Sequence, residues 1–280
     1  MRNAVALGTF DGLHKGHLAV LSIPDGYRKI ALIFDIPPKC SQNGEIELLL
    51  TPSEKIERLE NSGFSVHTLK FSEVKDLTAE EFLEFVKERF NPSLISCGFN
   101  YRFGNKGLGD TSLLESFCKE NSITLQVQRP VTDNGETVSS SLIRNALKIG
   151  DVSKANRLLG YDFSFETEVI KGDGRGKGLG FPTINQKYPK DLTKPKFGVY
   201  KSEITINEKT FKGITNIGMR PTFPTDFVIC ETFIIGFGGD LYGKSLKITL
   251  KEFLREEKKF SDEKELSAQV LSDIEKIQGV

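Results

Sequence analysis

The sequence of 280 residues has no tryptophan, two methionines, four cysteines and three histidines. The cysteines form no C-x-x-C pair and are not spaced with the histidines as zinc ligands, which argues against a zinc site and favours free thiols in a reducing compartment. No apolar run approaches the roughly 20 residues that a membrane span requires, and the first residues show no signal-peptide pattern. We therefore expect a cytoplasmic protein with no membrane partner.

The chain also carries no net charge. Lys and Arg together number 38, Asp and Glu together number 38, and the formal net charge is zero. A broad nucleic-acid-binding surface needs a basic excess, so we expect no nucleic-acid partner. A small anionic ligand needs only a local pocket and is not excluded. With 38% hydrophobic residues the chain can bury a core, and its length fits one large domain or two ordinary ones.

The first half of the chain alternates between strand and helix patterns. Short apolar runs are separated by segments that carry apolar residues at helical spacing and capping residues at their starts. Such alternation predicts a doubly wound, Rossmann-like parallel sheet. The predicted strands are 4–8, 30–34, 94–98 and 123–127, and the predicted helices are 53–62, 78–90 and 111–121.

After about residue 160 the pattern changes to closely spaced strands. The turn signals between them, Asn207-Glu208 among them, predict a small antiparallel barrel, and an amphipathic segment at 262–277 predicts a C-terminal helix. We therefore expect one domain at 1–155 and a second at 156–280. The predicted strands of the second domain are 165–170, 198–206, 211–217, 230–237 and 245–250.

A glycine-rich string follows the first predicted strand. It runs from Gly8 to His17 and reads G-T-F-D-G-L-H-K-G-H. His14 and His17 are three residues apart, so they share a face if a helix begins here, and imidazoles beside free backbone N–H groups can donate to phosphate oxygens. Turn glycines with surface histidines are the alternative. The whole string directly after a strand favours phosphate binding.

This string resembles the H-x-G-H signature of the nucleotidylyltransferase superfamily and, more narrowly, that of the bacterial bifunctional riboflavin kinase/FAD synthetases. Residues 97–104 (C-G-F-N-Y-R-F-G) and 138–144 (V-S-S-S-L-I-R) are similar to two further motifs of that family. The resemblance implies that His14, His17 and Arg144 stabilise pyrophosphate charge and that Asn100 and Phe103 bind flavin. It assigns ATP or phosphate binding to Gly8, Phe10, Asp11, Gly12, Gly16, Ser139 and Ser140. Serines before a helix are more often plain caps, which remains the alternative for the last two.

A second glycine-rich string spans 172–185 and reads G-D-G-R-G-K-G-L-G-F-P-T-I-N. Every second residue from Gly172 to Gly180 is glycine, with Arg175 and Lys177 between them, so the backbone of this cationic loop can wrap a polyphosphate. Thr183 could supply a hydroxyl and Asn185 a carbonyl to Mg²⁺, which prefers hard oxygen ligands. A plain flexible turn is the alternative, which five alternating glycines and two cations disfavour.

The second string resembles the riboflavin kinase signature, and further pieces of that family follow in order at 198–200, 216–223, 239–243 and 253–255. The resemblance implies a six-stranded antiparallel β-barrel with a C-terminal helix. It implies that Glu231 is the base for the ribityl 5′-hydroxyl, although a glutamate on a strand is usually only solvated. It assigns flavin binding to Pro182 and Arg255, Mg²⁺ binding to Thr183 and Asn185, and phosphate binding to Gly172, Arg175, Gly176, Gly180 and Asn185.

A third glycine string has a different interpretation. Residues 238–245 read G-G-D-L-Y-G-K-S and fit the Walker A pattern. That loop must open a helix, whereas the segment from Ser245 alternates apolar and polar residues as a strand does. We therefore predict a hairpin turn at this place and reject an ATP-binding P-loop.

The chain departs from the family pattern near the first string. The family usually carries F-[DE]-P-H-P after its second strand, whereas Pro37 stands at the position of the histidine. Proline offers neither a side-chain donor nor an ionisable group. We expect the adenylylation step to survive, because the other motifs are intact, but to be slower than phosphorylation.

Together the resemblances imply a bifunctional enzyme that takes riboflavin, FMN and ATP as small-molecule substrates and Mg²⁺ as cofactor. The first reaction makes FMN and ADP from riboflavin and ATP, and the second makes FAD and pyrophosphate from FMN and ATP. A kinase with weak or lost adenylyltransferase activity and a non-catalytic flavin-binding sensor are the alternatives. Flavoenzyme clients and the oligomeric state stay open.

Overall fold

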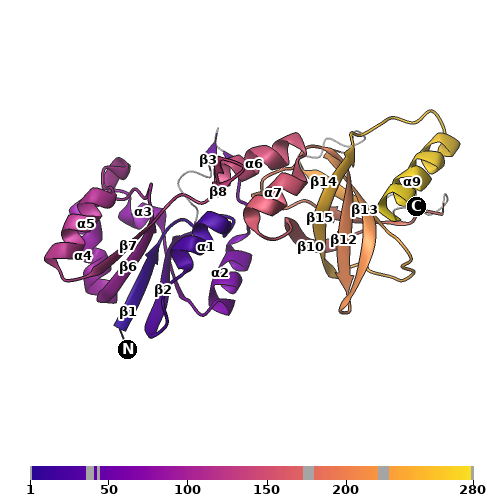
Figure 1. Cartoon of the computed structure of the whole chain (residues 1–280). Helices are drawn as coiled ribbons and strands as arrows, with labels where there is room; N and C mark the ends of the chain where they lie inside the picture. The colour runs from indigo at the N-terminus through magenta and orange to yellow at the C-terminus, as the bar shows by residue number, and fades with distance from the viewer. Residues whose placement is uncertain (1, 36–40, 43–44, 173–179, 220–226, 279–280) are drawn as a thin grey trace. The chain divides into compact units, whose positions relative to one another are not determined.

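The computed structural model describes residues 2–35, 41–42, 45–172, 180–219 and 227–278. The chain divides into two compact units, Met1–Leu142 and Ile143–Val280, which are described separately. Figure 1 shows the first in indigo to magenta and the second in rose, orange and yellow. The boundary that we expected after residue 155 falls inside a helix of the second unit and stays a prediction.

The first unit is built on a parallel sheet of five strands in the order β5-β2-β1-β6-β7. Each neighbouring pair is parallel, which confirms the doubly wound fold. The strand order reverses beside β1, and open α/β sheets bind ligands at such a reversal, outside the carboxyl ends of the strands. The strands are β1 (Arg2–Leu7), β2 (Tyr27–Phe34), β5 (Ser65–Leu69), β6 (Pro92–Gly98) and β7 (Thr124–Gln128).

Helices flank this sheet and begin where the sequence places capping residues. Thr51 and Thr78 each form a capping box with the glutamate three residues later, at the starts of α2 and α4. Four of these strands and helices α2, α4 and α5 were predicted, whereas β5 was not, because its half-exposed residues form no apolar run. The helices are α1 (Lys15–Leu21), α2 (Pro52–Asn61), α3 (Phe71–Val74), α4 (Ala79–Phe90) and α5 (Thr111–Glu120). Short elements are β3 (Ser41–Gln42), β4 (Glu45–Ile46), η2 (Asn105–Gly107), β8 (Thr132–Asp133) and β9 (Glu136–Thr137).

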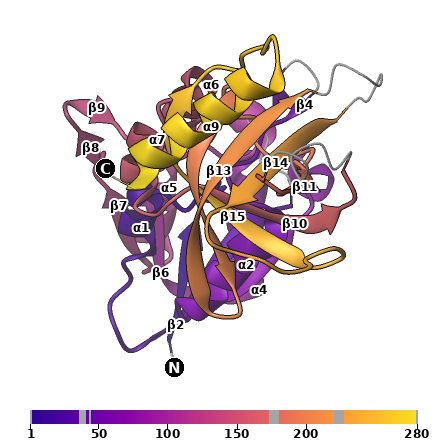
Figure 2. The same cartoon turned by 90° about the vertical axis from the view of Figure 1, so that its right-hand side faces the viewer.

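The second unit is a closed antiparallel barrel in the order β10-β11-β14-β13-β12-β15, which confirms the predicted six strands. Helix α9 (Glu263–Gln278) lies across the outside of the barrel near β13 (Figure 2). Helix α6 (Ser140–Ile149) begins in the first unit and is followed by α7 (Val152–Leu159). The strands are β10 (Ser164–Ile170), β11 (Thr183–Lys187), β12 (Gly198–Ile206), β13 (Lys209–Met219), β14 (Val228–Ile234) and β15 (Ser245–Arg255).

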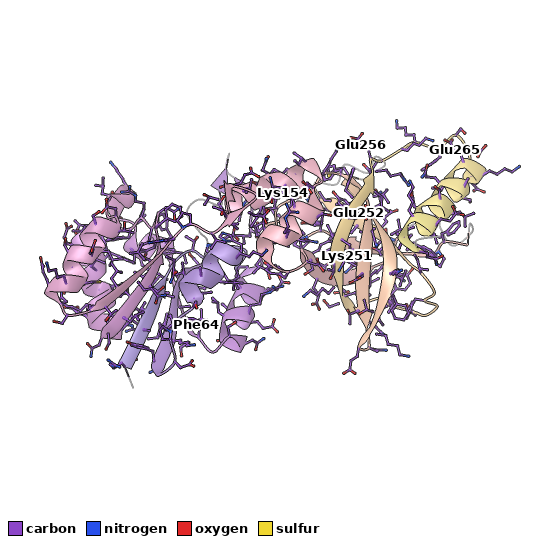
Figure 3. The ribbon with its side chains drawn as sticks, in the orientation of Figure 1. Phe64, Lys154, Lys251, Glu252, Glu256 and Glu265 are labelled. Carbon is purple, nitrogen blue, oxygen red and sulfur yellow. The ribbon has the colours of Figure 1, made fainter. Side chains whose placement is uncertain are left out.

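Two local predictions in the barrel are confirmed. Asn207 and Glu208 both have positive φ angles, 48° and 66°, which is the backbone of a two-residue hairpin turn between β12 and β13. Ser245 begins β15 and not a helix, so the Walker-like string is no P-loop. Further along β15, Lys251 (Figure 3) pairs with Asp162 at 2.6 Å.

Other sequence expectations concern cysteines and membranes. Cys97, Cys118 and Cys230 are free and buried. Burial raises the pKa of the Cys97 thiol to about 12, so it stays protonated at neutral pH. Within the described part of the chain, none of the helices is both long and apolar enough to cross a membrane.

Candidate active sites

The string Gly8–His17 forms a tight turn between the end of β1 and α1. Phe10, Gly12 and Leu13 have positive φ angles of 48°, 83° and 40°, so the backbone reverses sharply. The Phe10 ring is fully buried, and a Cβ on Gly8 would come within 2.9 Å of it. The Phe10 ring therefore packs inside the turn and supports its shape. Because the ring is buried, this residue could contact ATP only through its backbone.

The two histidines of the string come together at the start of α1. Their rings stack with centroids 3.6 Å apart, and Nδ1 of His14 accepts the backbone N–H of His17 at 3.3 Å. A neutral His14 therefore carries its proton on Nε2. Burial, then the neighbouring His14 and then Lys55 lower the pKa of His17 well below its ordinary value. His17 is consequently a neutral hydrogen-bonding group at pH 7 and not a cation.

Side-chain hydrogen bonds brace this turn from two directions. Asp11 is buried, and its Oδ1 accepts the backbone N–H of Leu49 at 2.9 Å. The Ser140 hydroxyl donates to the carbonyl oxygen of Asp11 at 2.9 Å. Ser139 accepts the N–H of Leu142 at 3.3 Å, which is the plain capping bond that the sequence left as the alternative. These contacts give Asp11 and Ser140 a structural role at the turn.

Helix α6 carries the arginine of the same motif. Arg144 stands four residues after Ser140, so the two lie on one face of α6, and Arg144 is buried. Gly16 lies under His14, because a Cβ at Gly16 would stand 3.1 Å from the His14 ring. Ligand binding by these residues stays a prediction.

The predicted flavin segment of the first unit follows β6. Asn100 is exposed just beyond the carboxyl end of that strand, next to the exposed ring of Phe99. Phe103 is 5% exposed and packs between Phe82 and Tyr101, with ring centroids 5.7 and 5.6 Å away. In this structure Phe103 supports the segment from the core, and a flavin contact stays a prediction for both Asn100 and Phe103.

Sequence reasoning missed one buried cation at the first site. Lys55 on α2 is 3% exposed, and its Nζ donates to the carbonyl oxygen of Phe34 at 3.2 Å. The available signal was its position four residues before Leu59, which places a lysine on the buried face of an amphipathic helix.

In the barrel, the predicted kinase residues fall into one cross-strand row. Asn185 on β11 pairs with Glu231 on β14, and Glu231 pairs with Asn216 on β13. Asn216 pairs with Val199 on β12, which pairs with Arg255 on β15. Directly opposite residues in a sheet have Cβ atoms about 4.5–5.5 Å apart and point to one face. The strand register therefore places Asn185, Glu231 and Arg255 on one face of the barrel sheet. The first and last of them are 70 positions apart in the sequence.

This row lies on the outer face of the barrel. The alternate residues Thr215 and Thr232 are buried inside, with their hydroxyls 2.9 Å apart. Ile214 and Phe233, which share the face of the row, pack with α9. Thr183 stands two residues before Asn185 and opposite Phe233, so it joins the same face.

The contacts of Arg255 and Asn216 assign further residues to this region. Arg255 pairs with Asp273 of α9, and both its Nε and one terminal nitrogen lie 2.9 Å from the same Oδ2. Asp273 is fully buried, so Arg255 ties β15 to α9, and its flavin contact stays a prediction. Asn216 donates to Glu257 at 3.1 Å, while its buried Oδ1 finds no donor among the described residues.

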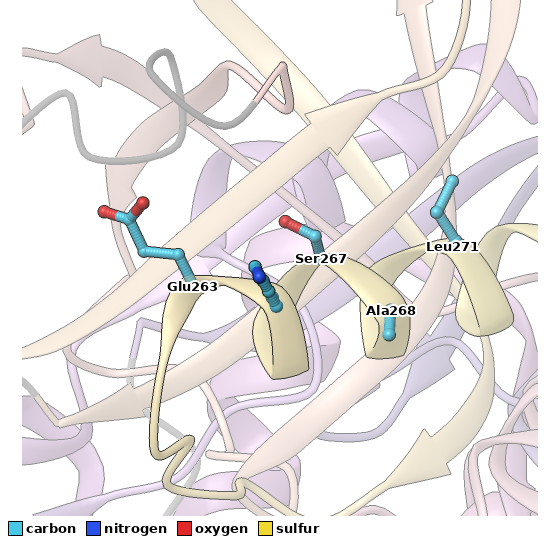
Figure 4. A pocket seen from close by; sticks show the side chains of 5 residues that line it. Glu263, Ser267, Ala268 and Leu271 are labelled. Carbon is cyan, nitrogen blue, oxygen red and sulfur yellow. The ribbon is translucent and has the colours of Figure 1, made fainter.

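The remaining predicted residues are placed as follows. Arg175, Gly176 and Pro37 lie outside the described residues. Gly172 approaches the Asn185 side chain so closely that a Cβ would overlap it. Pro182 is exposed, and Gly180 takes a positive φ of 83°. A hollow along α9 (Figure 4) contains none of the predicted residues; it is lined by Glu263, Lys264, Ser267, Ala268 and Leu271.

Comparisons with known proteins match each unit of the chain to a different family model. A family model described as FAD synthetase matches residues 1–142, and one described as riboflavin kinase matches residues 159–280. A bifunctional riboflavin kinase/FMN adenylyltransferase from Bacillus subtilis is 32% identical, with 97% of this chain and 90% of the relative covered. One from Listeria monocytogenes is 30% identical, with 98% and 90% covered. A Streptococcus pneumoniae crystal structure named macrolide-efflux protein has a TM-score of 0.91 at 27% identity, covering 100% of this chain and 94% of that one.

Proposed function

The chain belongs to the family of bifunctional riboflavin kinase/FMN adenylyltransferases, and from that premise we propose how its two units divide the work. The barrel transfers the γ-phosphoryl group of ATP to the ribityl 5′-hydroxyl of riboflavin, giving FMN and ADP. The α/β unit transfers the adenylyl group of a second ATP to the FMN phosphate, giving FAD and pyrophosphate.

Adenylyl transfer is assigned to the turn between β1 and α1, and the stacked histidine pair is the observation that carries this assignment. A phosphate oxygen of FMN attacks the α-phosphorus of ATP, and negative charge develops on the departing pyrophosphate. The reaction needs no protein nucleophile, so hydrogen-bond donors aimed at that charge supply the catalysis. His14 and His17 are such donors, and Nδ1 of His17 finds no hydrogen-bond partner among the described residues, so this atom is not committed to another contact.

Arg144 and Ser140 complete this assignment. Arg144 would contact the triphosphate bidentately, because a guanidinium matches phosphate geometry. Ser140 is assigned to holding the turn through the Asp11 carbonyl, which is the contact that the structure supports.

Phosphoryl transfer is assigned to the row on the outer face of the barrel. Glu231 stands between Asn185 and Asn216, and it would accept the proton of the ribityl hydroxyl as that oxygen attacks the γ-phosphorus. Gly172 supports the assignment, since its missing side chain lets the start of the phosphate loop lie against Asn185. The buried, unpaired Oδ1 of Asn216 offers one further acceptor beside Glu231.

Mg²⁺ is proposed as the cofactor of both reactions, and the donor set of the barrel fits it. Thr183 and Asn185 present a hydroxyl and an amide oxygen from one strand face, and the Glu231 carboxylate lies opposite Asn185. No group of three His, Cys, Asp or Glu residues that could hold a metal occurs within the described residues, which suits an ion held partly by ATP phosphates. Bound there, the ion would neutralise charge on the phosphates, while Glu231 would remove the proton of the hydroxyl.

One experiment separates this proposal from its alternatives. The protein is incubated with riboflavin, ATP and Mg²⁺, and the flavins are separated over time. Formation of FAD supports both activities. FMN alone supports a kinase with lost adenylyltransferase activity, and no product supports a flavin-binding sensor. We also propose that the protein works in the cytoplasm, in keeping with its free buried thiols; localisation of a tagged chain tests this.

A further inference from the structure

The first unit buries a lysine against the backbone of its glycine-rich turn. Lys55 is 3% exposed, and its Nζ lies 3.2 Å from the carbonyl oxygen of Phe34 and 3.5 Å from that of Thr9. Phe34 ends β2, and Thr9 lies two residues beyond the end of β1. One ammonium therefore joins the carboxyl ends of two neighbouring parallel strands. An apolar residue would leave these carbonyl oxygens without this donor.

The segment that carries Lys55 holds the turn at a second point. The backbone N–H of Leu49 donates to the buried carboxylate of Asp11 at 2.9 Å. Leu48, Leu49 and Leu50 are all buried and anchor this segment in the core. Residues 48–55 therefore hold the turn through both Thr9 and Asp11, the two neighbours of the buried Phe10.

The charge of Lys55 also acts on the histidine pair. It is one of the three causes that lower the pKa of His17, after burial and His14. A cation within electrostatic reach of His17 also lies within reach of a phosphate bound to that ring. In a buried site such a charge acts more strongly than it would in water.

We propose that Lys55 is a positioning residue for adenylyl transfer, which fixes the Gly8–His17 turn to β1 and β2 and adds a positive charge near the phosphate site. This inference rests on the proposed placement of adenylyl transfer at that turn. Lys55 forms no covalent bond with substrate and moves no proton. It acts through the backbone that carries His14 and His17 and through its field.

Three substitutions separate the two contributions of Lys55, its hydrogen bonds to the backbone carbonyl oxygens and its positive charge. Lys55→Met removes both, Lys55→Gln keeps a donor for the carbonyl oxygens but removes the charge, and Lys55→Arg keeps both. Arg58→Met is the matched control, because it removes a positive charge from the same helix one turn later. Riboflavin phosphorylation by the same sample reports the folded barrel, and circular dichroism reports the fold of the first unit.

We expect kcat for FAD formation from supplied FMN to fall about 10–100-fold in Lys55→Met, the scale of a misplaced catalytic constellation. Lys55→Gln should lose less, Lys55→Arg least, and the KM for FMN should change less than kcat. Arg58→Met should keep the kcat of the unsubstituted protein, and phosphorylation should be unchanged throughout.

The inference is overturned if folded Lys55→Met or Lys55→Gln keeps kcat within twofold, or if Arg58→Met loses as much. It is also overturned if both Lys55→Met and Lys55→Gln unfold the first unit, because Lys55 would then serve stability alone. His17→Ala distinguishes failure of the proposed site from failure of the proposed role of Lys55. If that variant keeps full adenylyl transfer, the site assignment itself fails; if it loses transfer while Lys55→Met does not, only the role of Lys55 fails.

Discussion

The two sites of this protein are built in opposite ways. The adenylylation site proposed in the α/β unit comes from one continuous string, Gly8–His17, whose geometry is set by backbone turns and a buried phenylalanine. The phosphorylation site proposed in the barrel is a row across five strands, in which each position supplies one side chain. A change in the turn should therefore act through geometry, whereas a change in the row should act through the chemistry of the group removed.

The substitution expected to separate the two activities most strongly is at Glu231. Glu231→Gln keeps the size and polarity of the side chain but cannot accept the proton of the ribityl hydroxyl. FMN formation should fall about 10²–10⁴-fold, the usual contribution of a positioned base. FAD formation from supplied FMN should not change. Glu203→Gln, on β12, is the matched control. Equal loss of both reactions in a folded Glu231→Gln protein would contradict the assignment.

Arg255 tests whether the row depends on α9. Arg255→Met leaves the fully buried Asp273 without its positively charged partner, and breaking a buried pair costs about 3–5 kcal/mol. Thermal unfolding should show a lower melting temperature for the barrel, with adenylyl transfer intact. The double variant Arg255→Met/Asp273→Leu should recover part of that loss. If Arg255→Met is as stable as the original protein but binds riboflavin poorly, the flavin role is the better interpretation.

His17 tests the other side of the comparison. His17→Ala removes a donor to the developing charge and one ring of the stack, so adenylyl transfer should lose about 2–4 kcal/mol of transition-state stabilisation. Riboflavin phosphorylation should continue at its original rate. His67→Ala, in the same unit on β5, is the control for loss of a histidine. Rates of FAD formation from FMN measure the effect, and full activity of His17→Ala would refute the site.

The two sites are also expected to differ in speed. Pro37 stands where the family carries a histidine, and one lost polar contact costs about 1–3 kcal/mol, or roughly one to two decades in rate. With riboflavin and ATP supplied together, FMN should accumulate transiently before FAD appears. Pro37→His should reduce that accumulation. A time course in which FAD appears with no detectable FMN would argue against a slower adenylylation step.

The smallest effect is expected from pH. The pKa of His17 is lowered in the folded protein, chiefly by burial, so the unfolded chain binds more protons below about pH 6.5. The contribution of His17 to stability is therefore complete above that pH and is lost as the pH falls towards the lowered value. His17→Ala should reduce the difference in melting temperature between pH 7.5 and 5.5 by a few degrees. The pKa of His67 is shifted in the same direction, so His67→Ala is measured alongside. An unchanged difference in His17→Ala would contradict a neutral His17 in the folded protein.

Local patterns were enough to predict most elements of this protein. The doubly wound sheet, the barrel and the hairpin at Asn207-Glu208 follow from runs of neighbouring residues, and both glycine-rich strings are read directly along the chain. Strand β5 and strand β11 were missed, since one is half-exposed and the other lies inside the string that was interpreted as a binding loop. A pattern reports burial through apolar periodicity, and these strands have little of it.

Sequence patterns alone thus predicted the two units, their order and the residues now proposed for both sites. The contacts between distant residues became visible only in the fold: Lys55 joins the ends of β1 and β2, Asp273 holds Arg255, and Phe103 packs in the core. The physical reason is that local propensity and periodicity act over a few residues, whereas these contacts depend on strand register and helix placement across 18 to 46 positions. Helical spacing can indicate that a lysine such as Lys55 is buried, but its partners are fixed only when the strands and helices come together.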